Sequence, residues 1–483
     1  MLGAALVVCI LLAGLLVAEP VHAQSGNYNE LASAGVNGQA TYQIAERRTA
    51  ISEDGRFVAF TYSGDDLVQG DTNRDTDVFV RDLLVGRTEL VSVGSNGRQG
   101  VGAKLEAMSA DGRFVAFSTD DPSFEQDPVG SDRNSATDVF VRDTRLHTTV
   151  RVSKVRDLSG NFVEGNGDSL TASISDDGRR VAFITAATNL DPRNPDTNNA
   201  PDLIVVDVPT GFGERASVDQ TGGQFSNGIA VPRPGLDDWS TIALSGDGAW
   251  VSFQTSTGTV PPFGLPSKVY LWERKVGGRT HMVHSELTGG LPLAFMPDLD
   301  RDGDSLSFTS LAGIDPADRY PVPTYDLYVA QGSPYSTTFR WATADRRIRL
   351  VADDPGSISS GGDRVTFTGH IATGLDSQVF VADLAAGNPP ALTLVTPSVT
   401  TGRATAGLGT VDLYPSISGD GRYVSFNSPH QDLVPGDRSR GAGNERDVFV
   451  WGPPRFIDID DTFPPRCPKK DWRLTGEIPP CWW

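Results

Sequence analysis

Seven short segments decide the fold of this chain, and each is a polar turn followed by a strand that ends in phenylalanine. They read SEDGRFVAF from Ser52, SADGRFVAF from Ser109, SDDGRRVAF from Ser175, SGDGAWVSF from Ser245, DRDGDSLSF from Asp300, SSGGDRVTF from Ser359 and SGDGRYVSF from Ser418. The last glycines of these turns are spaced 57, 66, 70, 55, 59 and 59 residues apart. Self-similarity at such a period is the sequence signature of a repeat architecture.

The repeat around Ser109 shows how one unit is built. Residues 107–109 form a short innermost strand, and Asp111-Gly112 makes a tight turn because glycine accepts a positive φ. The second, third and fourth strands are expected at 113–117, 138–143 and 148–153. Apolar residues on both faces of these strands fit sheets stacked face to face around an axis. The sequence therefore predicts an all-β, seven-bladed propeller of four-stranded blades.

The N-terminal segment supplies the strand that the seventh repeat lacks. After Gly452 the chain continues into Pro453-Pro454, which ends the repeat before a fourth strand. Residues 29–35 (NELASAG) match residues 88–94 (TELVSVG), which lie at the fourth strand of the first repeat. We therefore expect the N-terminal strand to complete the last blade and to remove two open sheet edges.

The turn-and-strand unit resembles the TolB-like, WD-repeat-like β-propeller family of bacterial exported proteins, over roughly residues 27–452. The resemblance implies the fold and says little about function. TolB itself implies a six-bladed ring, a separate N-terminal domain and periplasmic scaffolding. This chain departs from that pattern, with seven repeats and no room for the additional domain.

The two ends of the chain differ from the repeats. Residues 1–23 contain an apolar run followed by a small-residue cleavage pattern, which predicts a signal peptide and export, with an uncleaved anchor as the alternative. The propeller is expected at 24–452 and a Pro-rich tail at 453–483. The tail holds Cys467 and Cys481, which we expect to form one disulfide in an exported protein, with metal ligation by two thiolates as the alternative.

The composition restricts the possible partners. The chain has a net charge of −20, and a surface this acidic repels nucleic acid and anionic lipid. The acidic surface can serve solubility alone, and the more specific interpretations are that it binds a divalent cation or a basic partner. We expect no nucleic-acid partner, no membrane insertion after signal cleavage, no cofactor and a monomer.

An acidic spacing before the third strand is the best candidate for chemistry. Three repeats share the form Asp-x-Asn-x-x-x-Asp: Asp71, Asn73 and Asp77; Asp132, Asn134 and Asp138; and Asp196, Asn198 and Asp202. Alternating oxygen side chains on a tight loop suit Ca²⁺, which takes 6–8 oxygen ligands. The other interpretation is that these side chains cap the turns that lead into the strands. We assign no catalytic residue and no metal ligand from the sequence.

The predicted function is a non-catalytic binding or scaffolding module for a protein or glycan partner. Recognition is expected on the loops between second and third strands: Thr119–Ala136, Ala186–Pro201, Thr255–Ser267 and Ser428–Arg446. The tail tryptophans Trp472, Trp482 and Trp483 are the competing docking element. The alternative function is a propeller-type polysaccharide hydrolase or lyase, which histidine, arginine and two carboxylates converging at the axial mouth would favour.

Overall fold

The protein is described by a computed structural model. Its described residues are 27–35, 45–122, 124, 132–219, 221–229, 242–255, 269–274, 279–282, 294–310, 325–332, 339–344, 348–351, 356–371, 376–401, 403, 413–430, 432–435 and 446–454.

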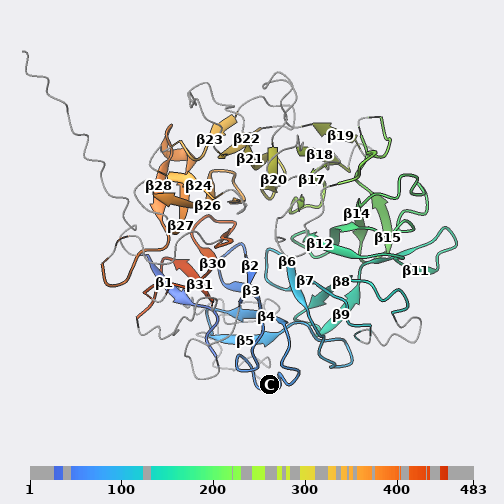
Figure 1. Ribbon diagram of the computed structural model, residues 1–483, viewed down its shortest axis with the longest axis horizontal. Coiled ribbons are helices and arrows are strands. Elements are labelled where there is room, and N and C mark those ends of the chain that lie inside the picture. The colour runs from blue at the N-terminus through green and yellow to red at the C-terminus, as the bar shows by residue number, and fades with distance from the viewer. Residues whose placement is uncertain are drawn as a thin grey trace, which may run out of the picture.

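Seven sheets surround a central axis (Figure 1), which confirms the seven-bladed propeller. The first three blades, with strands ordered from the axis outward, are β2 (Ala45–Ile51), β3 (Phe57–Tyr62), β4 (Asp77–Asp82) and β5 (Arg87–Leu90); β6 (Lys104–Met108), β7 (Phe114–Thr119), β8 (Asp138–Asp143) and β9 (Thr148–Arg151); and β12 (Ser169–Ile174), β13 (Arg180–Thr185), β14 (Asp202–Asp207) and β15 (Phe212–Arg215).

The remaining four blades repeat the same antiparallel order. The fourth blade is β16 (Ile242–Leu244), β17 (Trp250–Gln254), β18 (Val269–Glu273) and β19 (Arg279–Met282), and the fifth is β20 (Ala294–Leu299), β21 (Ser305–Ser310), β22 (Asp326–Gln331) and β23 (Phe339–Trp341). In the sixth, two short strands, β24 (Ile348–Leu350) and β25 (Ser357–Ile358), both pair with β26 (Arg364–Ile371), which is followed by β27 (Ser377–Asp383) and β28 (Ala391–Leu394). The seventh is β29 (Ser416–Ile417), β30 (Val424–Ser428), β31 (Asp447–Gly452) and β1 (Tyr28–Leu31).

Two smaller elements lie outside this pattern. A hairpin of β10 (Lys154–Arg156) and β11 (Phe162–Glu164) stands between the second and third blades. A 3₁₀ turn, η1 (Leu384–Ala386), follows β27. Within the described ranges, no helix has the length and apolar character needed to cross a bilayer.

The Ser-x-Asp-Gly turns fold as the sequence predicts because each one satisfies its own polar groups. In the first turn the Ser52 hydroxyl donates to Asp54 Oδ1 at 2.6 Å and accepts the Phe57 N–H at 2.8 Å. Gly55 donates its N–H to the Ser52 carbonyl at 3.0 Å and has a φ of +73°, which favours glycine. The same bonds recur at Ser109, Ser175, Ser245 and Ser418. The repeated sequence is therefore a self-capped hairpin turn.

The hydrophobic core lies between the blades. One cluster combines Val78 and Val80 of the first blade with Val115, Phe117 and Phe140 of the second. Apolar residues on both faces of a strand are thus buried by the two neighbouring sheets, as the sequence pattern indicates. Stacking of this kind makes each blade depend on the next.

The N-terminal strand closes the ring, as predicted. β1 pairs antiparallel with β31, with Tyr28 opposite Gly452 and Leu31 opposite Phe449. Beyond the strand, the Ser33 hydroxyl donates to Asp447 Oδ1 at 2.7 Å and accepts the Val448 N–H at 3.0 Å. The last blade consequently has its fourth strand from the other end of the chain (Figure 1).

The two ends of the propeller are built differently. Because consecutive strands are antiparallel, the Ser-x-Asp-Gly turns share one end, which we call the turn end, with the turns between third and fourth strands. The connections between second and third strands share the opposite end, the loop end, with the links to the next blade. The loop-end connections between second and third strands differ in length, from residues 372–376 in the sixth blade to residues 120–137 in the second.

Candidate functional site

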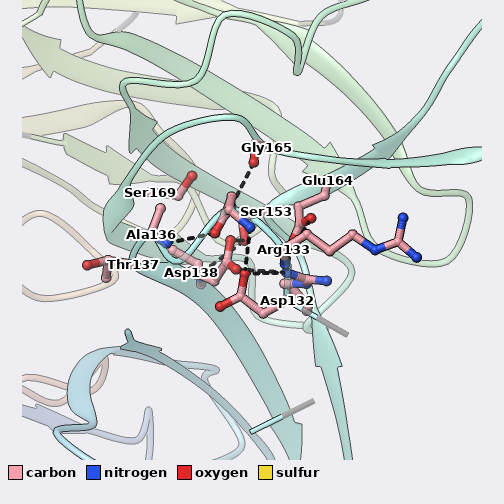
Figure 2. Close-up of polar contacts among 12 residues, drawn as sticks. Asp132, Arg133, Ala136, Thr137, Asp138, Ser153, Glu164, Gly165 and Ser169 are labelled. Atoms are coloured by element: carbon pink, nitrogen blue, oxygen red, sulfur yellow. Dashed lines mark hydrogen bonds and ion pairs between the residues drawn. The ribbon is translucent and has the colours of Figure 1, made fainter. Parts of the chain in front are cut away.

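The described carboxylates gather most closely at the loop end of the second blade (Figure 2). Asp138, the first residue of β8, is buried, and its Oδ1 accepts the Ser153 hydroxyl at 2.5 Å. The Ser153 oxygen in turn accepts the Val139 N–H at 3.2 Å. Equivalent pairs are Ser92 with Asp77 and Ser217 with Asp202, at 2.5 and 2.6 Å. This corner is therefore part of the repeat.

The asparagine of the acidic spacing supports the turn in front of the third strand. Asn134 donates from Nδ2 to the Gly165 carbonyl at 2.7 Å, and its Oδ1 accepts the Ala136 N–H at 2.7 Å. Asn73 and Asn198 make equivalent bonds to Gly100 and Phe225. Asn134 Oδ1 thus has a main-chain partner, as the turn-capping interpretation predicts.

The aspartate two residues earlier caps the same turn. Asp132 Oδ1 accepts the N–H groups of Asn134 and Ser135 at 3.0 and 3.2 Å. Asp196 accepts those of Asn198 and Asn199 at 3.0 and 3.3 Å. These bonds use one carboxylate oxygen, so the turn role leaves the other oxygen for a further interaction.

Glu164 adds a third carboxylate that the sequence pattern does not indicate. It belongs to β11, and one of its oxygens lies within 4.8 Å of oxygens from Asp132 and Asp138, a grouping able to hold a metal ion. Glu164 lies in the hairpin between blades, one residue before the carbonyl that accepts the Asn134 bond, and the equivalent positions in the first and third blades are Gln99 and Gln224. Among the described histidine, cysteine and acidic residues, this is the group that has metal-ligand geometry.

Arg151 supplies a cation to this group. Its Nη1 lies 2.8 Å from Asp138 Oδ2, 2.5 Å from Glu164 Oε1 and 4.0 Å from Asp132 Oδ1. The side chains of Arg151 and Asp138 are each 3% exposed. Burial raises the pKa of Asp138, while Arg151 and the Ser153 hydroxyl oppose that rise. A metal ion could bind all three carboxylates only if the guanidinium moved away.

The third blade has the same arginine–aspartate pair with fewer surrounding charges. Arg215 Nε lies 2.9 Å from Asp202 Oδ2, and both side chains are buried. Gln224 stands where the second blade has Glu164, and its Oε1 accepts the Thr197 N–H at 3.1 Å. An arginine at the end of the fourth strand thus neutralises the buried aspartate in two neighbouring blades.

A second set of charges lies on the innermost strands. Glu106 accepts the Ser118 hydroxyl at 2.7 Å and the Ala172 N–H of the next blade at 3.1 Å. Arg48 Nη1 of the preceding blade lies 3.5 Å from Glu106 Oε2. Asp298 in the fifth blade accepts the Ile358 N–H of the sixth at 3.0 Å. Burial raises the pKa of Asp298 to about 6, and the positive charge of Arg48 opposes this rise. These side chains tie adjacent blades together.

The turn end is joined into a belt by the residues that follow each turn serine. Glu53 donates its N–H to Ala110 at 2.8 Å, and Asp420 donates to Glu53 at 3.1 Å, linking the first blade to both neighbours. Arg301 Nε lies 2.6 Å from Asp176 Oδ2, and Ser360 donates to Glu53 Oε2 at 2.7 Å. Side chains from the first, third, fifth and sixth blades therefore meet at this end.

The described histidines lie in four different blades: His147 in the second, His281 of β19 in the fourth, His370 in the sixth and His430 in the seventh. His147, in a turn of the second blade, places Nδ1 3.2 Å from Glu89 Oε1. His430 is buried after β30, and burial lowers its pKa. His370 belongs to β26. Cys467, Cys481 and the tail tryptophans lie outside the described residues, as does much of Thr119–Ala136, Thr255–Ser267 and Ser428–Arg446.

Comparison with known proteins relates the chain to others through its fold. No family model and no curated sequence matches it. Solved structures do: an oligogalacturonate lyase from Vibrio parahaemolyticus is 12% identical, with a TM-score of 0.51 over 89% of this chain and 97% of that one. An oligogalacturonate lyase in complex with manganese is 13% identical, with a TM-score of 0.52 over 90% and 97%. TolB from Acinetobacter baumannii is 14% identical, with a TM-score of 0.37 over 78% and 79%.

These similarities concern the propeller and not its chemistry. At such low identity a shared fold carries no residue roles from one chain to another. At 12% and 13% identity, the two lyase structures show that the propeller fold is shared and nothing more.

Proposed function

We propose that the mature chain is an exported binding or scaffolding module that recognises a protein or glycan partner at its loop end. One observation carries the proposal: the turn end is a belt of repeated, internally bonded turns, whereas the loop end carries connections that differ from blade to blade. A rigid frame that presents dissimilar loops on one rim is the usual arrangement of a recognition surface.

Exposed apolar side chains provide a direct test because both ends carry them. Val101 and Val399 lie in loop-end connections and are 43% and 48% exposed. Val85 and Leu146 lie in turn-end loops and are 61% and 64% exposed. Val101→Glu and Val399→Glu should each reduce capture of the protein or glycan partner by about tenfold, which is roughly 1.4 kcal/mol. Val85→Glu and Leu146→Glu are the matched controls.

The tail is tested in the same experiment. A chain that ends at Pro454 should retain the partner if the loop end binds it. Loss of binding in the truncated protein, with unchanged binding in Val101→Glu and Val399→Glu, would move recognition to Trp472, Trp482 and Trp483. Equal binding by all loop-end and turn-end variants and by the truncated chain would contradict the proposal.

Export and a monomeric state belong to the same proposal. The apolar segment at 1–23 and the charge of −20 support them. Mass spectrometry of the secreted protein should give a chain that begins at Gln24, and light scattering should give the mass of one chain.

A second candidate, a polysaccharide hydrolase or lyase, is favoured by one observation. Arg48, Glu106 and Asp298 place a cation and two carboxylates on innermost strands. Glu106→Gln and Asp298→Asn variants that remain folded would abolish turnover of acidic polysaccharides if this candidate were correct. Absence of turnover by the unmodified protein favours the binding module.

A further inference from the structure

The first blade carries the acidic corner without the arginine that the second and third blades have. Strand register shows which residues are equivalent: Arg151 stands opposite Phe140, Arg215 opposite Ile204, and Leu90 opposite Phe79. Leu90 is thus at the position from which the second and third blades supply a guanidinium. The buried aspartates of the first blade, Asp71 and Asp77, are equivalent to Asp132 and Asp138 of the second.

Asp77 is completely buried and only partly satisfied. Its Oδ1 accepts the Ser92 hydroxyl at 2.5 Å, while its Oδ2 is buried and has no hydrogen-bond partner among the described residues. In the second blade the equivalent Oδ2 receives Arg151. A buried carboxylate oxygen without a partner is costly, which makes this atom a candidate ligand.

Asp71 presents the same feature beside it. The residue is 8% exposed, and its Oδ2 also has no hydrogen-bond partner within the described ranges. Gln99 Nε2 lies 3.4 Å from the other oxygen, Oδ1. Burial raises the pKa of both carboxyls, to about 6 for Asp77, and nearby negative charges add to the rise, while hydrogen bonds from the Ser92 and Asn73 side chains oppose it at Asp77. The corner therefore has two unsatisfied anionic oxygens and an excess of negative charge.

The surrounding charges do not compensate. Asp65 and Asp66 raise the pKa of Asp71, and Asp75 raises that of Asp77. Arg74 lies nearby in sequence, but its side chain is 84% exposed and its Nε pairs with Asp65 Oδ2 at 3.3 Å. Among the described residues, the second and third blades thus place an arginine at this corner, and the first blade places none there.

We propose that Asp71 and Asp77 bind a Ca²⁺ ion at the loop end of the first blade, where a guanidinium stands in the second and third blades. Ca²⁺ fits because it takes carboxylate and carbonyl oxygens in flexible geometry, whereas Mg²⁺ demands a near-ideal octahedron and keeps its waters. Extracellular calcium modules bind with a Kd of roughly 10⁻⁴–10⁻³ M. The ion would fix the turn before β4 and replace the missing arginine.

The decisive experiment uses the mature chain, calcium chloride and variants of the same corner. Calorimetry should give one site in the unmodified protein, and calcium should raise its Tm more than magnesium at equal concentration. Asp77→Asn should weaken binding at least about tenfold, which is roughly 1.4 kcal/mol. Asp196→Asn, at the position in the third blade equivalent to Asp71, should retain the site.

Leu90→Arg keeps the test valid if Asp77→Asn does not fold. This variant supplies the guanidinium found in the second and third blades, so it should raise the Tm without metal and abolish the response to calcium. No calcium-dependent change in Tm up to about 10 mM, ten times the weakest Kd above, would overturn the proposal. It would also be overturned if Leu90→Arg left calcium binding unchanged. Neither result bears on recognition at the loop end.

Discussion

Tyr423 of the last blade packs directly on Gly55 of the first. A Cβ atom added to Gly55 would lie 2.1 Å from Tyr423 Cδ2, and the glycine has a φ of +73°. The same relationship joins Gly112 to Phe57 and Gly178 to Phe114 along the ring. The aromatic residue at the start of the second strand, or directly before it as at Tyr423, thus occupies the space that the turn glycine of the next blade leaves free. At Gly55 this contact joins the two ends of the repeat.

Gly55→Ala should therefore destabilise the protein by about 2–5 kcal/mol, through the positive φ and the overlap with the tyrosine ring. Gly160→Ala is the matched control, because Gly160 has a φ of +85° and nothing within 4 Å of its would-be Cβ. The control should cost about 1–2 kcal/mol. Denaturant unfolding measures both, and equal losses would show that the contact with Tyr423 contributes nothing.

Ser33 should hold the closing strand through its two buried bonds to β31. Ser33→Ala leaves Asp447 Oδ1 and the Val448 N–H without this partner and should cost about 1–3 kcal/mol. Ser159→Ala, in an exposed turn, should change stability by less than about 0.5 kcal/mol.

Deleting residues 24–40 should lower the Tm much further than Ser33→Ala, because it opens two sheet edges. An unchanged melting curve after the deletion would contradict closure.

The fold could be predicted because two features recur in each blade, the polar turn with the strand that follows it and the third strand. The closing strand was predictable too, since NELASAG matches a fourth strand elsewhere in the chain. The split inner edge of the sixth blade, β24 and β25, was not, because both strands are short and lie apart in sequence. The β10–β11 hairpin was missed because it is a longer version of turns that in the first and third blades form only single bridges, Val93 with Gln99 and Val218 with Gln224.

Only part of the candidate site could be predicted from the sequence. The aspartates and asparagines of the acidic spacing make turn-capping bonds, one of the two interpretations that the sequence allows, and these bonds follow from local chemistry. The guanidinium of Arg151 reaches them from a strand that follows the spacing, and Glu164 from a hairpin beyond it. Only the strand register shows that Leu90 replaces an arginine, so the difference between blades required the structure.

The tail disulfide stays a prediction, because both cysteines lie outside the described residues. We expect the non-reduced mature protein to show no free thiol at Cys467 or Cys481. Alkylation followed by mass spectrometry measures this directly. Two alkylated cysteines in the unreduced protein would contradict the bridge, and reduction of a correct bridge should cost roughly 3 kcal/mol at most if the tail is part of the folded unit.

Arg151 should contribute far more to the free energy of unfolding than an exposed arginine does. Arg151→Met removes the cation from a corner with three carboxylates, and breaking such a buried pair costs about 3–5 kcal/mol. Arg133→Met, beside the same corner but exposed, should cost less than about 1 kcal/mol. Urea unfolding at pH 7.5 measures the difference. A loss at Arg151 no larger than the control would mean that the carboxylates are neutralised in another way.

Asp300 predicts a pH dependence with a definite sign, because it stands where other turns have serine. Its Oδ1 accepts the Ser305 N–H at 3.1 Å, as Ser52 Oγ accepts that of Phe57. A serine also donates to the aspartate two residues later, which an ionised carboxylate cannot do. Burial and the neighbouring Asp304 raise the pKa of Asp300 to about 7.

The raised pKa means that the native state favours the protonated carboxyl. Its contribution to stability is complete below the unfolded pKa of about 3.9 and is lost as the pH rises through about 7. Asp300→Ser should consequently stabilise the protein at pH 8 by about 2 kcal/mol or more, since one pKa unit corresponds to about 1.4 kcal/mol. The gain should shrink towards pH 5. Burial also raises the pKa of Asp298 and of Asp77 to about 6, but both groups are present in the two proteins. The difference between the two stability curves therefore reports Asp300 together with its interaction with Asp304. Asp120→Ser, at an exposed position, should leave the curve unchanged, and parallel curves for Asp300→Ser and the unmodified protein would disprove the assignment.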